Sequence, residues 1–155
     1  MSVSSKQGPA ANLATDYCKI VLSSSTKNLG ALLNTVRETN EGGGVLQIFD
    51  PAHVSSEGQM LAAYLNARAR FRNKTNRTRS VANEMLLFVA LTNQLGTAIA
   101  KAGAKGNDSF VVFADTGSSY SKLSKMLGPA KKISKHGVDD SAAFSKMALL
   151  QIESG

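Results

Sequence analysis

The sequence predicts a single domain of the α/β (α+β) class, with a small mixed or antiparallel sheet flanked by helices. Short runs rich in β-branched and aromatic residues alternate with longer segments whose apolar residues recur every three or four positions. The chain has 155 residues, a usual size for one domain, and its 43% hydrophobic content can form one core. We expect a flexible arm over residues 1–15, which are small and polar, and the domain over residues 16–155.

Three segments are expected to be strands because they are short and β-prone. They comprise residues 17–22, 45–49 and 110–114. The segment from Met147 to Ile152 is compatible with a last strand or with a last turn of helix. Its position at the end of a mixed pattern favours a strand.

Helices are expected where apolar residues recur at helical spacing. Five helices are expected. The first covers residues 28–39, and the second follows Ser55 and Ser56 and is interrupted at 73–76. The third runs from about Ser80 to 91, the fourth ends at Gly103, and the fifth covers residues 118–127. Ser55 or Ser56 can cap the second of these helices, and Thr92 or Asn93 can cap the fourth.

The positive charge of the chain is concentrated in one stretch, RARFRNKTNRTR, at residues 68–79. It has six basic residues and no acidic one, whereas 12 basic residues face 11 acidic ones in the rest of the chain. A solvated helix end would be the simplest interpretation. Arginine nevertheless outnumbers lysine by five to one, and arginine binds phosphate through two donors and stacks on bases. We therefore predict RNA or phosphate contacts from Arg68, Arg70, Arg72, Lys74, Arg77 and Arg79.

Glu84 lies in the apolar segment VANEMLLFVAL. A glutamate in the first turn of a helix is favoured by the helix dipole. If the carboxylate is buried, it must also be paired, and Arg77 or Arg79 is the expected partner. Arg79 is the nearer of the two to the helix.

The sequence contains no recognisable catalytic constellation. His53 and His136 have no metal-ligand companion at helical spacing, and Asp139 and Asp140 are better explained as helix-capping residues than as paired catalytic carboxylates. Cys18 is the only cysteine, which excludes an intramolecular disulfide and a zinc site built on cysteines. We therefore expect a non-enzymatic protein with no cofactor and no bound metal.

Neither a signal peptide nor a membrane span is expected. The first 17 residues contain no apolar segment of signal-peptide length, and no apolar run approaches about 18 residues. We expect a cytoplasmic protein without a membrane partner.

Residues 73–105, NKTNRTRSVANEMLLFVALTNQLGTAIAKAGAK, resemble the central motif of the kinase-binding subunit of the KEOPS complex. The matching positions are Arg79-Ser80, Glu84, Gln94-Leu95, Ala98-Ile99 and Gly103. The segments VLQIFDPAHV and FVVFA also fit the family. The resemblance extends over about residues 17–152 and is greatest over 45–115.

This resemblance implies a non-catalytic adaptor that binds the small atypical kinase of KEOPS and supports the synthesis of threonylcarbamoyladenosine in tRNA. The threonylcarbamoyl-transferase subunit is then an indirect partner. We interpret the chain as an archaeal member, and archaeal members also bind tRNA at its CCA end. The family's C-terminal region takes part in kinase binding, which implies kinase contacts from Leu149, Leu150 and Ile152. A stand-alone basic RNA-binding protein associated with the ribosome is the alternative.

Overall fold

The computed structural model describes residues 18–24, 29–105, 109–133 and 141–154, with the side chains of 24, 132, 141–144 and 152–154 excepted. The expected N-terminal arm, residues 1–15, lies outside this range. The described part of the chain forms an α+β domain around a four-stranded antiparallel sheet in the order β2-β3-β1-β4. Its strands are β1 (Lys19–Ser24), β2 (Leu46–Phe49), β3 (Ser109–Ala114) and β4 (Ala130–Lys132).

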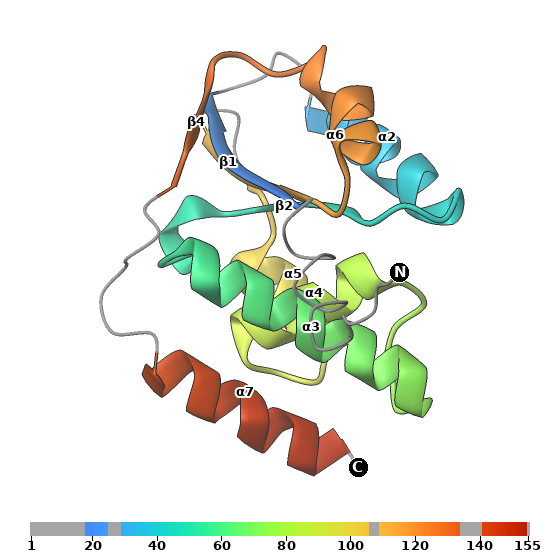
Figure 1. Cartoon of the computed structure of the whole chain (residues 1–155), viewed down its shortest axis with the longest axis vertical. Helices are drawn as coiled ribbons and strands as arrows, with labels where there is room; N and C mark the ends of the chain where they lie inside the picture. The colour runs from blue at the N-terminus through green and yellow to red at the C-terminus, as the bar shows by residue number, and fades with distance from the viewer. Residues whose placement is uncertain (1–17, 25–28, 106–108, 134–140, 155) are drawn as a thin grey trace, which may run out of the picture.

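Helices cover both faces of this sheet (Figure 1). One face carries α2 (Leu29–Glu41) and α6 (Gly117–Ser124). The other face carries α3 (Glu57–Asn73), α4 (Val81–Ala90) and α5 (Leu95–Ala102). The 3₁₀ helix η1 (Pro51–His53) follows β2, and α7 (Ser141–Ser154) lies along the outer side of α3.

Alternating side chains of the central strand β3 fill two cores, one on each face of the sheet. Phe110 and Val112 pack with α2 and α6, whereas Val111 and Phe113 pack with the helices of the opposite face. This alternation follows from the two-residue period of a strand. Because both faces are covered, β3 is almost continuously apolar, which is why residues 110–114 were recognisable as a strand.

Serine caps set the start of two helices. The sequence predicts the cap at Ser56, whereas for Ser80 it predicts only the approximate start of the helix. The hydroxyl of Ser56 accepts a hydrogen bond from the N–H of Gln59 at 3.0 Å, and that of Ser80 accepts from the N–H of Asn83 at 3.1 Å. The interruption expected at residues 73–76 is confirmed, because α3 ends at Asn73.

The start of α5 differs from the expectation. Its N-cap is Gln94, which makes no side-chain capping bond, and not Thr92 or Asn93. The hydroxyl of Thr92 instead accepts from the N–H of Gln94 at 3.2 Å, and the side chain of Asn93 is bound to Arg70. The end expected at Gly103 is confirmed.

The predicted strand from Met147 to Ile152 is wrong, because this segment belongs to α7. Met147 and Leu150 are buried and three residues apart, whereas Leu149 between them is 58% exposed. This pattern fits the helical period, while a strand would place Met147 and Leu149 on the same face.

A further difference is the lysine-containing segment 130–132, which forms the edge strand β4 beside β1. The sequence did not predict this strand.

No single helix among the described residues is both long and apolar enough to cross a membrane. Taken together, α4 and α5 reach that length and composition, but they meet at a bend of 69°.

Candidate functional site

The C-terminal end of α3 and its connection to α4 carry an exposed group of basic side chains. We call it the basic surface, and its members are Arg68, Arg72, Lys74, Arg77 and Arg79. Within the described part of the chain, none of these five forms an ion pair with a carboxylate. The guanidinium of Arg68 lies 5.4 Å from the centroid of the Tyr64 ring. The structure therefore leaves five of the six predicted RNA-binding residues accessible.

Arg70 is the exception, and the prediction that it contacts RNA is wrong. Its side chain is completely buried, and its Nη1 lies 2.9 Å from Oε2 of Glu84, which is also completely buried. Arg70 follows Ala63 and Ala67 on the inward face of α3, and these small side chains leave room for a long one. The signal in the sequence that could have identified Arg70 as buried is its position three residues after Ala67 and seven after Ala63, on the same face of the helix.

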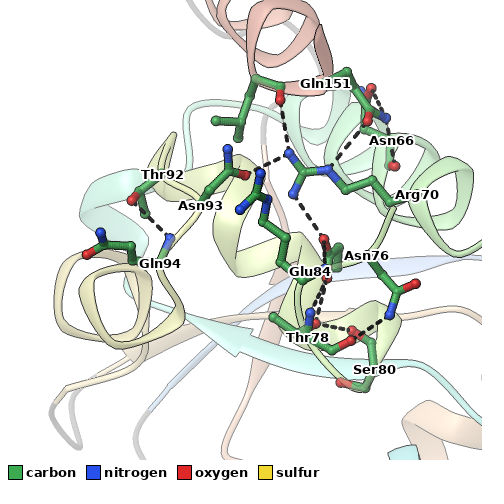
Figure 2. A network of polar contacts seen from close by, with 12 residues as sticks. Asn66, Arg70, Asn76, Thr78, Ser80, Glu84, Thr92, Asn93, Gln94 and Gln151 are labelled. Carbon is green, nitrogen blue, oxygen red and sulfur yellow. Dashed lines mark hydrogen bonds and ion pairs between the residues drawn. The ribbon is translucent and has the colours of Figure 1, made fainter. Parts of the chain in front are cut away.

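The other donors of Arg70 are also used (Figure 2). Its Nη2 donates to Oδ1 of Asn93 at 2.8 Å and to the backbone carbonyl of Leu150 at 3.1 Å, and its Nε lies 3.4 Å from Oε1 of Gln151. The guanidinium also lies 4.3 Å from the centroid of the Phe88 ring. A buried charge needs partners of this kind to offset the loss of water.

Glu84 holds the segment that leads into α4. Its carboxylate accepts from the backbone N–H of Arg77 at 3.0 Å, from that of Thr78 at 2.9 Å and from the Thr78 hydroxyl at 2.6 Å (Figure 2). The expectation that Arg77 or Arg79 pairs with Glu84 is therefore wrong, since Arg70 is its ionic partner. Arg77 reaches the carboxylate through its backbone only, which leaves its guanidinium in solvent.

A pocket of about 530 Å³ lies next to the basic surface, beside the edge strand β2. Its apolar lining comes from Leu33, Val36, Ile48, Leu86 and Ile99. Arg79 also lines it and so joins the pocket to the basic surface. These residues belong to α2, β2, α4 and α5 and the turn before α4, which explains why no local sequence pattern predicted the pocket.

The outer edge of β2 is covered by side chains at this pocket. The amide of Asn40 donates to the carbonyl of Leu46 and accepts from its N–H, both at 2.9 Å. The side-chain oxygen of Gln47 accepts from the N–H of Ile48 at 3.0 Å. These contacts replace a neighbouring strand and block pairing with another chain.

The predicted kinase-contacting residues are not equivalent in the structure. Leu149 is 58% exposed on the outer side of α7, whereas Leu150 is 6% exposed and packs in the core next to α3. The expectation that Leu150 contacts a partner is therefore contradicted by its burial. The side chain of Ile152 lies outside the described residues.

Two observations concern metal binding and the reactivity of Cys18. They contain no cluster of three His, Cys, Asp or Glu side chains suited to a metal ion. Burial and, to a smaller extent, the charge of Asp115 raise the pKa of the Cys18 thiol to about 12, so it is protonated at neutral pH. His136, Asp139 and Asp140 lie outside the described part.

The family model described as "Kinase binding protein CGI-121" matches residues 24–151, which is most of the chain. No curated protein matches the sequence significantly. The match agrees with the resemblance carried by residues 73–105. It covers β2, β3, β4, the basic surface and α7 through Gln151, whereas β1 lies outside it except for Ser24. The chain therefore belongs to the CGI-121 family of kinase-binding proteins, the family of the kinase-binding KEOPS subunit.

Proposed function

We propose that this protein is a non-catalytic, cytoplasmic adaptor of KEOPS that binds the atypical kinase subunit on one surface and tRNA near its CCA end on another. In this role it supports threonylcarbamoyladenosine formation, with the transferase subunit as an indirect partner. The observation that carries the RNA part of the proposal is the basic surface, whose five cations are exposed and have no carboxylate partner among the described residues. Family membership supports the kinase part.

The basic surface suits a nucleic-acid backbone. Like charges that lie close together repel each other, and binding to a polyanion relieves the repulsion. Glu84 holds the backbone N–H groups of Arg77 and Thr78 and so presents the Arg77 side chain from an anchored segment. A preorganised surface loses less conformational freedom on binding than a mobile loop does.

The neighbouring pocket suits the single-stranded end of such a ligand. Apolar walls can contact the face of a base, and the adjoining guanidinium of Arg79 can contact a phosphate. A strand that follows the basic surface from Arg72 to Arg79 would reach the pocket at its end. We propose that the acceptor end of tRNA takes this path.

A matched pair of triple variants tests RNA binding. Changing Arg72, Lys74 and Arg77 to Ala removes three exposed cations from the basic surface. The control changes Lys122, Lys125 and Lys131 to Ala, which removes the same charge from α6, its C-cap and β4. Binding of a labelled tRNA is measured by fluorescence anisotropy at several salt concentrations.

Each lost phosphate contact should reduce the slope of log K against log salt by about 0.7 for a single strand and about 0.9 for a duplex. We therefore expect the first variant to bind more weakly, with a slope reduced by about 2–3. The control should keep most of the slope. Equal slopes for wild type and the first variant, or equal losses in both variants, would refute an RNA contact at the basic surface.

The kinase contact is tested at Leu149, which is exposed and can be changed without opening the core. We expect Leu149→Asp to weaken binding to the purified kinase subunit, measured by isothermal titration calorimetry. Leu33→Asp is the control, because Leu33 is 44% exposed on α2 at the other side of the sheet. Unchanged affinity in a folded Leu149→Asp variant would exclude this surface.

Co-purification separates the proposal from a stand-alone, ribosome-associated RNA-binding protein. The KEOPS kinase and transferase subunits should be recovered with the tagged chain. Recovery of ribosomal proteins without the kinase would favour the alternative.

A further inference from the structure

The Arg70–Glu84 ion pair lies between the two surfaces to which the proposed function assigns different partners. On one side, Glu84 accepts from the backbone N–H groups of Arg77 and Thr78, within the basic surface. On the other side, Arg70 donates to the carbonyl of Leu150 in α7, next to the exposed Leu149. The two ends of the network are therefore connected by one contact of 2.9 Å between two buried charges (Figure 2).

Several hydrogen bonds give α7 a polar attachment to this network. The amide nitrogen of Gln151 donates to the carbonyl and to Oδ1 of Asn66 in α3, at 3.0 and 3.1 Å. The oxygen of the same amide lies 3.4 Å from Nε of Arg70. Met147 and Leu150 supply the apolar contacts of the described part of α7.

Separation of α7 from α3 would change the surroundings of the ion pair. Arg70 would lose the Leu150 carbonyl and the Gln151 amide, and water would reach its guanidinium. A higher local dielectric weakens the attraction between Arg70 and Glu84. The carboxylate of Glu84 would then compete less well with water for the N–H groups of Arg77 and Thr78. Opening of the 77–78 segment would in turn leave Arg70 opposite a carboxylate that has lost its other donors.

We infer that Arg70 and Glu84 are positioning residues that couple the docking of α7 to the conformation of the basic surface. A protein partner that holds α7 against α3 then raises the affinity of the basic surface for RNA. Linkage requires that RNA raise the affinity for that partner by the same factor. The identity of the two partners rests on the proposed function, whereas the coupling between α7 and the basic surface does not.

Amide hydrogen exchange in the isolated chain tests the coupling directly. Met147→Ala removes an apolar contact of α7 and leaves every atom of the ion pair in place. If the two regions open together, exchange at the N–H groups of Arg77 and Thr78 should accelerate on the order of thirtyfold or more, along with exchange in α7. Exchange at Val112 in the centre of β3 should stay slow and reports that the sheet is intact. Faster exchange in α7 with no change at Arg77 and Thr78 would overturn the inference.

A second variant tests whether the guanidinium is the link. Arg70→Lys keeps a positive charge for Glu84, but a single ammonium cannot also reach Asn93 and Leu150 in the fork geometry of arginine. In this background, Met147→Ala should no longer affect exchange at Arg77 and Thr78. Arg72→Lys is the matched control on the exposed side of α3, and it should leave the effect of Met147→Ala unchanged. An undiminished effect in the Arg70→Lys background would show that the coupling does not pass through Arg70.

RNA binding supplies a readout at the functional surface. Met147→Ala should weaken tRNA binding severalfold, although Met147 is buried and cannot contact RNA. If wild-type chain binds no tRNA, the proposed function fails, and hydrogen exchange still decides whether the two regions are coupled. If wild-type chain binds tRNA and Met147→Ala binds it equally well, the RNA part of the inference is refuted while the proposed function stands.

Discussion

Arg70→Met is the substitution that most sharply tests the account of the buried network. Methionine keeps an unbranched side chain that suits a helix and the apolar surroundings, but it removes every donor of Arg70. Glu84 would retain the backbone N–H groups of Arg77 and Thr78 and the Thr78 hydroxyl, while losing its buried cation. The carbonyl of Leu150 and Oδ1 of Asn93 would each lose the hydrogen bond that Arg70 donates.

The expected loss in free energy of unfolding follows from this burial. Removing one partner of a fully buried ion pair costs about 3–5 kcal/mol, because the other charge remains buried without compensation. For a chain of this length each kcal/mol lowers the melting temperature by about 2–4 °C. We therefore expect the midpoint to fall by about 6–20 °C.

Thermal and urea unfolding followed by circular dichroism measure this loss. Arg72→Met is the matched control, since Arg72 is exposed two residues away on the same helix, and its effect should stay within about 0.5 kcal/mol. The double variant Arg70→Met, Glu84→Gln should lose less stability than the two single variants added together, because it removes both charges. A loss below about 1 kcal/mol for a folded Arg70→Met, or strict additivity in the double variant, would refute the account of the pair.

Three further predictions concern other parts of the chain. Cys18 should react with a thiol reagent at pH 8 far more slowly in the native state than in urea, because its pKa is raised from 9.0 to about 12 in the native state, and equal labelling rates would contradict this. Since the unfolded thiol loses its proton at a lower pH than the native one, the free energy of unfolding should also fall as pH rises above 9. Ser80→Ala should cost about 1 kcal/mol in urea unfolding through the loss of the N-cap bond to Asn83, and an unchanged midpoint would show that the cap is unimportant. Asn40→Ala should cost about 1–3 kcal/mol in the same assay by exposing the backbone groups of Leu46 at the edge of β2, and an unaltered stability would mean that water replaces the amide fully.

Local patterns in the sequence were sufficient to predict the central part of the fold. The strand at 110–114 is covered on both faces, and its continuous apolar run leaves little ambiguity. The cap predicted at Ser56 is present, and the helix expected to start near Ser80 begins there. The strand at 130–132 was missed because it is short, lies at the sheet edge and carries lysines, which is common for edge strands but not distinctive.

The C-terminal segment shows where a short apolar run is ambiguous. Met147, Leu149 and Leu150 fit a strand or a helix by composition, and only the neighbouring helix α3 decides which of them is buried. Tertiary packing, which no local window contains, therefore selected the helix.

The candidate site could be predicted only in part, because charge alone does not tell the direction of a side chain. The basic stretch was visible as composition, and five of its six basic residues are exposed. The sixth, Arg70, is turned inward by the helical period and meets Glu84 fourteen positions later in the chain. Locating the pocket beside Arg79 required the placement of α2 and α5 around β2, which a single sequence does not reveal.

We propose that one chain binds the KEOPS kinase and tRNA through separate surfaces, at Leu149 on α7 and at the basic surface beyond α3. Native mass spectrometry of the chain mixed with the purified kinase subunit and tRNA tests it most directly. We predict a ternary complex whose mass is the sum of all three molecules, which loses tRNA in the Arg72, Lys74, Arg77 triple variant and loses the kinase in Leu149→Asp. Binary complexes that exclude each other, or a ternary complex unaffected by either variant, would contradict the claim.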